Sequence, residues 1–457
     1  MATNITVIVL AAGQGKRMRS ELPKVLHPLA GRPLLSHVLE SSQALRAREI
    51  RVVHGHGGEQ VKQAFSNQAV VWIRQAEQRG TGHAVKQAMP GIKSQDVVLV
   101  LYGDVPLVQP ATLRKLVSRA ARGQLAILTA RLSDPTGYGR IIRGGHGGVL
   151  SIAEEKDAST TQRAIDEINT GLLACPAHLL AGWIRRLRAN NAQKEYYLTD
   201  CVALAVKDGV RVVAVPAESA DEILGINDKL QLAEAETILR RRNAMQLMTA
   251  GVGLADPARI DVRGVLKCGR DVTIDANVIF EGHVTLGDGV RVGPFTLIRD
   301  ATIGAGTVIH SHCVIEQGTI GACCDIGPYA RVRPDVQLAD GAKLGNFVEI
   351  KKSMIGAGSK VNHLSYIGDA SIGSNVNVGA GTITCNYDGA NKHRTVIGDG
   401  AFIGSGVELV APVEIGPGAT IGAGSTITKS APADQLTLER ARQSTIPNWK
   451  RPARKSR

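Results

Sequence analysis

The sequence is poor in aromatic residues and has neither a long apolar run nor a paired-cysteine motif. Phe, Trp and Tyr make up only 3% of the 457 residues, which leaves little material for the stacking surfaces that bind single-stranded nucleic acids. The apolar stretch that ends at Ala12 lacks a basic leader and is too short for a signal peptide or a spanning helix, and no longer stretch follows. Seven cysteines, an odd number, occur without zinc or disulfide spacing. We therefore expect a cytoplasmic protein with reduced thiols and no transmembrane segment.

The formal net charge of +13 is compatible with nucleic acid, a membrane surface or anionic small substrates. Five of these charges lie in the last nine residues and leave +8 for the rest of the chain: Lys450, Arg451, Arg454, Lys455 and Arg457. No helix-turn-helix signature accompanies them, so we expect phosphorylated metabolites and no nucleic acid. The alternative from another class, a nucleic-acid or membrane-surface protein, requires a salt-dependent interaction that disappears when residues 449–457 are removed.

Glycine divides the chain into two parts. Of the 51 glycines, 28 fall between Gly264 and Gly424. Before this region, apolar runs such as Ile5 to Leu10 alternate with helix-like segments, which predicts a mostly parallel, Rossmann-like α/β domain over residues 1–227. Residues 228–250 contain no Gly or Pro and are rich in Ala, Leu, Glu and Arg, which predicts a linker helix. The second domain then spans residues 251–457.

The second domain is an internal repeat with a period of six. Aliphatic residues recur at this spacing at Ile326, Val332, Leu338, Leu344 and Ile350, and again at Ile397, Ile403, Leu409, Ile415, Ile421 and Ile427. A parallel β-helix explains the period, because three hexads close one coil and each repeated aliphatic points into the core. The repeat breaks between Thr384 and Thr395, which predicts a loop ejected from one corner. The period does not reveal the handedness of the coil.

The first domain opens with a strand that runs into a turn of small residues. Ile5 to Leu10 is followed by Ala11-Ala12-Gly13-Gln14-Gly15, and Arg17 and Lys24 add positive charge. The backbone N–H groups of such a turn can approach a phosphate closely. The turn is neither a Walker loop nor a dinucleotide-binding fingerprint, because GK[ST] is absent and Met18 stands where the last glycine is required. Taken alone, it fits an ordinary strand-to-helix turn equally well.

Further motifs make this domain resemble the sugar-phosphate nucleotidyltransferases: Pro23-Lys24, Gln75, Gly80-Thr81-Gly82-His83-Ala84, Tyr102-Gly103-Asp104, Thr136-Gly137-Tyr138-Gly139-Arg140, Glu154, Asn169-Thr170-Gly171 and Gly225-Ile226-Asn227. With the hexapeptide repeats, nearly the whole chain resembles the bacterial family of bifunctional N-acetylglucosamine-1-phosphate uridylyltransferases / glucosamine-1-phosphate N-acetyltransferases. One departure is Lys16, where that family has Thr or Ser.

The resemblance implies a left-handed β-helix, a homotrimer and the synthesis of UDP-N-acetylglucosamine for the bacterial cell envelope. In that reaction sequence acetyl-CoA acetylates glucosamine 1-phosphate, and UTP then donates its uridylyl group to the product with release of pyrophosphate. Mg²⁺ is the implied cofactor, and UTP and acetyl-CoA are the co-substrates.

Uridylyl transfer brings two anions together and therefore requires cations. Asp104 follows the apolar strand Val97 to Leu101, at the carboxyl end where open α/β sheets bind ligands; a turn or helix-cap residue is the plain alternative. The resemblance makes Asn227 the second Mg²⁺ ligand, and oxygen donors suit that ion. It also implies that Arg17 and Lys24 hold the triphosphate, and it assigns nucleotide and sugar binding to Leu10, Ala11, Ala12, Gly13, Lys24, Gln75, Gly80, Thr81, Tyr102, Gly103, Asp104, Gly139, Glu154, Asn169 and Asn227.

Acetyl transfer needs a group that takes a proton from the attacking amine. His363 is offset from the inward positions Val361 and Ile367, so we expect it to point outward and to be this base, although a lone histidine is more often structural. The resemblance implies a sugar-phosphate site of Arg333, Lys351, Tyr366, Asn377 and Lys392, and an acetyl-CoA site of Ala380, Asn386, Tyr387, Ser405, Ala423 and Arg440. For Arg333 and Lys351 a solvated basic face is the alternative.

The ejected loop has no neighbour within its own coil, so we expect an adjacent subunit to complete each acetyltransferase site. Cys385 has no obvious activating partner in the sequence, which favours direct transfer without an acyl-enzyme. The main rival function is a single-activity sugar-phosphate nucleotidyltransferase whose β-helix is only an oligomerisation scaffold. A pure scaffold would not require the outward-facing set His363, Asn386 and Lys392.

Overall fold

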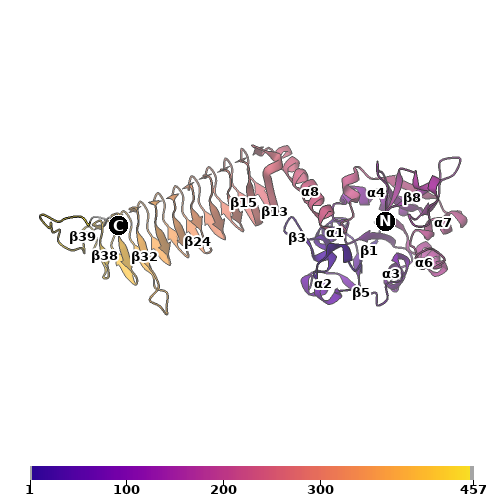
Figure 1. The fold of residues 1–457 in the computed structure, drawn as a ribbon, viewed down its shortest axis with the longest axis horizontal. Coiled ribbons are helices and arrows are strands. Elements are labelled where there is room, and N and C mark those ends of the chain that lie inside the picture. The colour runs from indigo at the N-terminus through magenta and orange to yellow at the C-terminus, as the bar shows by residue number, and fades with distance from the viewer. Residues whose placement is uncertain (1–2, 453–457) are drawn as a thin grey trace, which may run out of the picture. The chain divides into compact units, whose positions relative to one another are not determined.

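The computed structural model describes residues 3–452, so three of the basic-tail residues, Arg454, Lys455 and Arg457, lie outside the described part. The chain forms two compact units that divide between Leu239 and Arg240, inside helix α8 (Lys229–Thr249) (Figure 1). The first half of α8 packs in the first unit through Leu232 and Ala235, and the second half packs in the second unit through Ala244. Each unit therefore contains part of this helix.

The first unit is built around a mixed β-sheet with strands β1 (Ile5–Ala11), β4 (Glu49–His54), β5 (Val71–Arg74), β6 (Val97–Tyr102), β7 (Leu125–Arg131), β8 (Gly139–Arg143), β9 (Val149–Ala153), β10 (Glu167–Pro176) and β11 (Val212–Pro216). The strand order is β11-β7-β10-β6-β1-β4-β5, and β8 pairs with β9 and β10. The strands are parallel except around β10, which runs antiparallel to β6, β7 and β8, and in the β8–β9 pair. The mostly parallel arrangement predicted from the sequence thus carries an antiparallel insertion.

Both faces of this sheet are covered. The remaining elements are α1 (Leu34–Gln43), α2 (Gly58–Ala64), α3 (Thr81–Ala88), α4 (Pro110–Ala120), α5 (Thr160–Arg163), α6 (Ala177–Arg186), α7 (Asp200–Lys207), the 3-10 turns η1 (Lys16–Met18), η2 (Lys24–Leu26) and η3 (Ala220–Ile223), and the small hairpin of β2 (Pro28–Leu29) and β3 (Arg32–Pro33). Along β1, Val7 and Val9 join the core cluster with α1 and α4, whereas Ile8 and Leu10 join the cluster with α3, α6 and α7. Because successive side chains of a strand point to opposite faces, a strand covered on both sides reads as an unbroken apolar run.

The second unit is a parallel β-helix with short strands on its faces. One sheet contains β12 (Gly253–Leu254), β14 (Thr273–Ile274), β16 (Arg291–Val292), β19 (Val308–Ile309), β22 (Asp325–Ile326), β25 (Lys343–Asn346), β28 (Lys360–His363), β31 (Asn377–Val378), β34 (Phe402–Ile403), β37 (Thr420–Ile421) and β39 (Leu436–Thr437). The other sheet contains β13 (Ile260–Cys268), β15 (Val278–Leu286), β17 (Leu297–Arg299), β18 (Thr302–Ile303), β20 (Val314–Glu316), β21 (Gly318–Ile320), β23 (Arg331–Val332), β24 (Val336–Leu338), β26 (Glu349–Lys351), β27 (Met354–Ile355), β29 (Tyr366–Gly368), β30 (Ala370–Ile372), β32 (Ile383–Cys385), β33 (Thr395–Ile397), β35 (Glu408–Val410), β36 (Val413–Ile415) and β38 (Thr426–Ile427). The 3-10 turn η4 (Pro257–Arg259) lies between β12 and β13.

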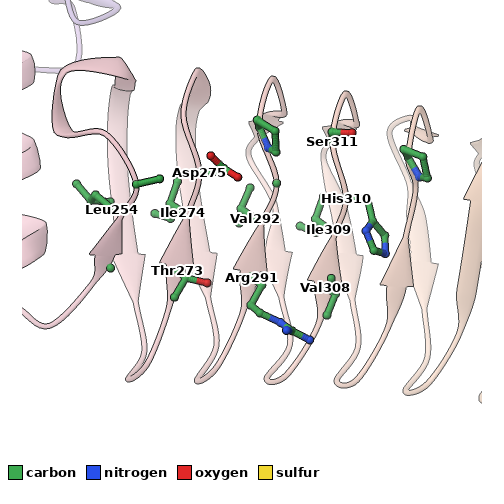
Figure 2. A pocket seen from close by; sticks show the side chains of 15 residues that line it. Leu254, Thr273, Ile274, Asp275, Arg291, Val292, Val308, Ile309, His310 and Ser311 are labelled. Carbon is green, nitrogen blue, oxygen red and sulfur yellow. The ribbon is translucent and has the colours of Figure 1, made fainter.

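The predicted aliphatic row is the core of this coil. From Ile326 to Ile350 its five members are at most 3% exposed. Successive coils pair in parallel register, so that equivalent residues stack over one another. Figure 2 shows Ile274, Val292 and Ile309 from β14, β16 and β19 at the same place in three successive coils.

The ejected loop is shorter than the sequence predicts. Thr384 belongs to β32 and Thr395 to β33, and both side chains are buried in the coil. Thr384 occupies a core position opposite Leu409, and its hydroxyl accepts a hydrogen bond from the Gly368 N–H at 2.7 Å. A threonine can occupy this aliphatic position because the backbone satisfies its hydroxyl. Because the residue is polar, the sequence pattern placed the end of the repeat too early.

Candidate active sites

The small-residue turn after β1 opens onto a cavity of about 250 Å³. Eight of the residues expected to bind the nucleotide line it: Leu10, Ala12, Gly13, Gln75, Gly80, Thr81, Tyr102 and Asp104. They come from the carboxyl ends of β1 and β6, the segment after β5 and the start of α3. The parallel pairing of β1 with β6 places the two strand ends side by side, which is where open α/β sheets bind ligands.

A cluster of three polar side chains lies at the edge of this cavity. The Lys24 ammonium donates to the Asp104 carboxylate and, at 2.8 Å, to Oδ1 of Asn227. Asn227 is far from Asp104 in sequence, but the N–H of Ile226 donates to the main-chain carbonyl of Asp104 at 2.9 Å and fixes the two segments together. Two oxygen ligands therefore converge on one cation. In this structure that cation is the lysine ammonium.

The residues expected to bind the sugar form a second group. Asn169 on β10 lies opposite Gly139 on β8. A side chain at Gly139 would come within 3.4 Å of the Glu154 carboxylate, so this glycine leaves room beside that acid. Thr199 donates to Glu154 at 2.7 Å, and burial raises the pKa of the Glu154 carboxyl. Asn169, Gly139 and Glu154 are thus brought together.

Tyr102 lies near both groups of residues, because it lines the cavity and its phenol is close to the Glu154 and Asp104 carboxylates. Burial, followed by the nearby Glu154 and Asp104 carboxylates, raises the pKa of the Tyr102 phenol far above its usual range. The phenol therefore stays protonated and can act as a hydrogen-bond donor. Ala11 and Gly103 pack against each other beneath the turn, and the N–H of Gly103 donates to Leu10. Neither Ala11 nor Gly103 is among the residues that line the cavity.

Two residues at the first site differ from expectation in their surroundings. Arg17 lies exposed on η1 and is not among the residues that line the cavity. Gln78 was not identified from the sequence, yet it lines the cavity and donates to the Ala12 carbonyl at 2.5 Å. Its position in the short segment between Gln75 and Gly80, both already recognised, was the available signal.

At the second site, the expected base and three expected acetyl-CoA residues form a column along one corner of the β-helix. The carbonyl of each column residue accepts a main-chain bond from the next coil: Leu364 N to Asn346 at 3.1 Å, Gly381 N to His363 at 3.2 Å, Gly406 N to Ala380 at 2.7 Å and Gly424 N to Ser405 at 2.9 Å. Arg440 continues it by donating to the Ala423 carbonyl at 3.0 Å. The exposed histidine, His363, is therefore followed on the next coils of this corner by the small side chains of Ala380, Ser405 and Ala423.

Two cations stack beside this corner on the other sheet. Arg333 follows β23 and Lys351 ends β26, on adjacent coils joined by the bond from Arg333 N to Ile350 O at 2.8 Å. Both are half-buried, and Arg333 is held by Glu349 at 2.8 Å. Tyr366 lies opposite Glu349 on the next coil. A half-buried, stacked arrangement of this kind is unlike a freely solvated basic face.

The ejected loop is ordered by its own contacts. Lys392 lies 4.2 Å from the ring centroid of Tyr387, a cation–π distance. The Asn391 N–H, followed by the His393 imidazole, holds the pKa of the Asp388 carboxyl well below its usual range. Asn386 ties the base of the loop to the coil through Asp369.

Asn377 is not brought to the histidine. It lies on β31 opposite Lys360, three residues before Ala380. Three residues of extended chain span roughly 10 Å, so Asn377 lies about that far from Ala380, the column residue on the coil after His363. Within this chain, Asn377 is thus separate from the corner column.

A larger hollow of about 830 Å³ lies on the same sheet near its first coils (Figure 2). Its lining includes Thr273, Arg291, Val308 and His310, but none of the predicted site residues. Within residues 3–452, no group of three or more His, Cys, Asp or Glu side chains is arranged to hold a metal ion. In the same range, no helix is both long and apolar enough to cross a membrane.

Comparison with known proteins agrees with this two-part organisation. Residues 7–142 match the MobA-like NTP transferase domain, and residues 267–300 and 394–429 match the bacterial transferase hexapeptide repeats. The bifunctional protein GlmU of Aromatoleum aromaticum is 58% identical over 98% of this chain and 99% of its own length. Those of an Azoarcus species and of Nitrosospira multiformis are 57% and 55% identical over 98% and 99% of this chain, and over 99% of their own lengths.

The fold and these matches define a two-domain transferase, a Rossmann-like nucleotidyltransferase joined to a left-handed parallel β-helix of hexapeptide repeats, and they confirm the predicted fold class. The chain belongs to the GlmU family of bifunctional proteins. It is a bifunctional uridylyltransferase and acetyltransferase of UDP-N-acetylglucosamine synthesis, as the sequence resemblance implied. The single-activity alternative does not describe this family.

Proposed function

We propose that the second unit acetylates glucosamine 1-phosphate from acetyl-CoA and that the first unit then converts the product to UDP-N-acetylglucosamine, with the residue roles given below. The observation that carries this assignment is the corner column, in which His363 precedes Ala380, Ser405 and Ala423 on successive coils. A scaffold needs only the inward aliphatic row, so the outward column requires another explanation.

In acetyl transfer, the sugar amine attacks the thioester carbon, a C–N bond forms and the C–S bond to coenzyme A breaks. His363 takes the proton that the amine loses. Arg333 and Lys351 bind the sugar phosphate as a pair of cations, with Tyr366 beside them. Ala380, Ser405 and Ala423 leave room along the corner for the pantetheine arm, and Arg440 meets a coenzyme phosphate, with Asn386 and Tyr387 contacting the arm from the loop.

In uridylyl transfer, a phosphate oxygen of the sugar attacks the α-phosphorus of UTP, and the bond to pyrophosphate breaks. Gln75, Gly80 and Thr81 hold the uracil nucleotide in the cavity after β1, while Glu154, Asn169 and Gly139 hold the acetylated sugar. Arg17 and Lys24 stabilise the departing pyrophosphate. For Arg17 this role requires the exposed η1 segment to approach the substrate.

The oxygens of Asp104 and Asn227 fit Mg²⁺, because both already converge on one cation. When bound, Mg²⁺ would screen the charges of the two reacting anions. Lys24 and the ion then compete for the same two oxygens, which frees the ammonium for the triphosphate.

We further propose that three subunits assemble through the β-helix. Asn377 matches the family's sugar-phosphate site but lies apart from the corner column of its own chain, and Lys392 belongs to the ejected loop, so a neighbouring copy would supply them. We place the enzyme in the cytoplasm, where UTP and acetyl-CoA are available and where seven free thiols remain reduced.

The test is to supply glucosamine 1-phosphate, UTP and Mg²⁺ and to measure UDP-sugar with and without acetyl-CoA. UDP-N-acetylglucosamine should form only when acetyl-CoA is present. Supplying N-acetylglucosamine 1-phosphate directly should remove the need for acetyl-CoA. Equal formation of UDP-glucosamine without acetyl-CoA would contradict the proposed order.

A further inference from the structure

His363 has a hydrogen-bond partner that neither the sequence motifs nor the family resemblance assigned. Nδ1 of its imidazole lies 2.9 Å from Oδ1 of Asn346. The two residues are directly opposite each other in the pairing of β25 with β28. Asn346 is half-buried, whereas His363 is exposed. The more buried side chain therefore restrains the more exposed one.

The main chain of His363 is fixed by other contacts. Its carbonyl accepts hydrogen bonds from the Gly381 N–H at 3.2 Å and from the Ser365 hydroxyl at 2.8 Å. These bonds fix the position of the Cα atom but not the rotation of the ring. The contact with Asn346 is the one that fixes the ring.

We propose that Asn346 is a positioning residue for acetyl transfer: its amide oxygen accepts the Nδ1–H of His363, so that Nε2 carries the free lone pair and faces the reacting amine. The proposal rests on the role of His363 as base. A neutral imidazole has one N–H and one acceptor nitrogen, and a hydrogen bond at one nitrogen decides which is which. An exposed ring without this partner would rotate and would divide itself between two tautomers.

Charged groups from three strands face the same space. His363 and Asn346 line a cavity of about 470 Å³ together with Asp325 on β22, Lys343 on β25 and Lys360 on β28. The Asp325 carboxylate is bound to Nε2 of His310 at 2.7 Å, which leaves Asn346 as the partner of the His363 ring. These groups stay constant when Asn346 alone is replaced.

The experiment compares Asn346→Leu and Asn346→Asp in the full-length enzyme. Asn346→Leu removes the acceptor and should lower kcat for acetyl transfer about tenfold to a hundredfold with little change in KM, because ring orientation acts on the proton transfer rather than on binding. Asn346→Asp keeps an acceptor at the same place and should retain most of kcat. Its carboxylate favours the protonated imidazole, so the acid limb of the pH–rate profile should move to higher pH.

Two controls separate positioning from structure. Asn362→Leu makes the same substitution in the same cavity and should leave both activities, the melting temperature and the oligomeric state unchanged. In the His363→Ala background, Asn346→Leu should have no further effect, because it acts through the missing ring. A merely structural role would instead give the same loss in both backgrounds.

The outcomes distinguish this proposal from the role of His363 itself. If His363→Ala abolishes acetyl transfer but Asn346→Leu stays within about twofold of wild type, Asn346 does not position the ring. If Asn346→Asp fails as badly as Asn346→Leu, the amide donates to Nδ1 instead of accepting from it, and the tautomer assignment is wrong. If His363→Ala remains active, the proposed base fails first.

Discussion

The two units bring their site residues together by different means. In the first unit, a covered sheet gathers residues from distant segments, so that Asp104 and Asn227 meet where the N–H of Ile226 binds the Asp104 carbonyl. In the second unit, His363, Ala380 and Ser405 meet because they hold equivalent positions on successive coils. A sheet-based site depends on topology, whereas a coil-based site depends on register.

This difference predicts that the units can be damaged separately. Each has its own core, and the cores share no member. A substitution confined to one unit should therefore change the activity of that unit and leave the activity of the other unit intact.

The largest separation is expected for Asp104→Ala. Removing one of the two converging oxygens should lower uridylyl transfer by about a thousandfold or more, while acetyl transfer stays within about twofold. Both activities are measured on the same preparation, and Mn²⁺ binding, followed by proton relaxation of water, should weaken in parallel. Asp134→Ala, at an exposed turn of the same unit, is the control. Loss of both activities in a folded Asp104→Ala protein would break the comparison.

The reciprocal variant is His363→Ala. Loss of a positioned base should lower acetyl transfer by about two to four powers of ten, with uridylyl transfer unchanged. The acid limb of the acetyl-transfer profile, which a protonated imidazole produces, should flatten. The exposed position of His363 implies that the melting temperature is retained, so a destabilised variant would identify a structural histidine instead.

Truncation tests where the units separate. A fragment of residues 1–250 keeps α8 and should retain uridylyl transfer but lose acetyl transfer and the trimer, as size-exclusion chromatography would report. A fragment ending at residue 230 loses Leu232 and Ala235, which cover Leu29, Leu34 and Leu107. It also loses Gln231, which accepts from the Asn227 N–H at 2.7 Å. Its melting temperature should be lower by roughly 5–10 °C. A still-trimeric 1–250 fragment would move the subunit contacts into the first unit.

The repeat made much of the second unit predictable. A period of six identifies inward residues one by one, and the position of His363 beside that row predicts its exposure. Register is harder to predict, because the offset between coils is 17 residues from Asn346 to His363 but grows to 25 across the loop from Ala380 to Ser405. A polar residue in the core row, Thr384, was sufficient to hide the loop boundary.

The first unit was predictable in its fold class and its motifs, but not in its contacts. The end of β6 at Tyr102 marks the place of Asp104, since apolar strands end where ligands bind in such sheets. The bonds from Lys24 to Asp104 and Asn227 could not be predicted, because no spacing in the sequence encodes contacts between residues 80 and 203 positions apart. Asn346 was missed because nothing in the sequence marks its partner, since His363 lies 17 residues away on the next coil.

The smallest expected effect compares one ion pair from each unit. In the first unit, Arg143 binds Glu167 through two hydrogen bonds, at 2.7 and 2.6 Å, and the carboxylate side chain is 11% exposed. In the second unit, Arg299 binds Glu281 on the neighbouring coil, with Arg263 at 3.1 Å on its other side, and both arginines are about two-fifths exposed. In each case the arginine lowers the pKa of the glutamate.

A lowered pKa in the folded state fixes the sign of the pH dependence. Each glutamate stabilises its unit at neutral pH, above the pKa of the unfolded chain, and this stabilisation is lost as the pH falls through the lower folded pKa. Glu167→Gln should lower the stability of the first unit at pH 7 by about 1–3 kcal/mol. Glu281→Gln should cost the second unit less than about 1 kcal/mol, because the Glu281 side chain is 20% exposed and its ion pairs are more strongly screened by solvent than that of Glu167. Calorimetry at pH 7 and at pH 4 should show both differences shrinking on acidification, with the first-unit transition assigned from the 1–250 fragment.

In about 1 M salt, where the Debye length is about 3 Å, the effect of Glu281→Gln on stability should vanish and the effect of Glu167→Gln should persist. Equal effects of the two substitutions would mean that the Arg299–Glu281 pair between neighbouring coils stabilises the β-helix as strongly as the partly buried Arg143–Glu167 pair stabilises the sheet.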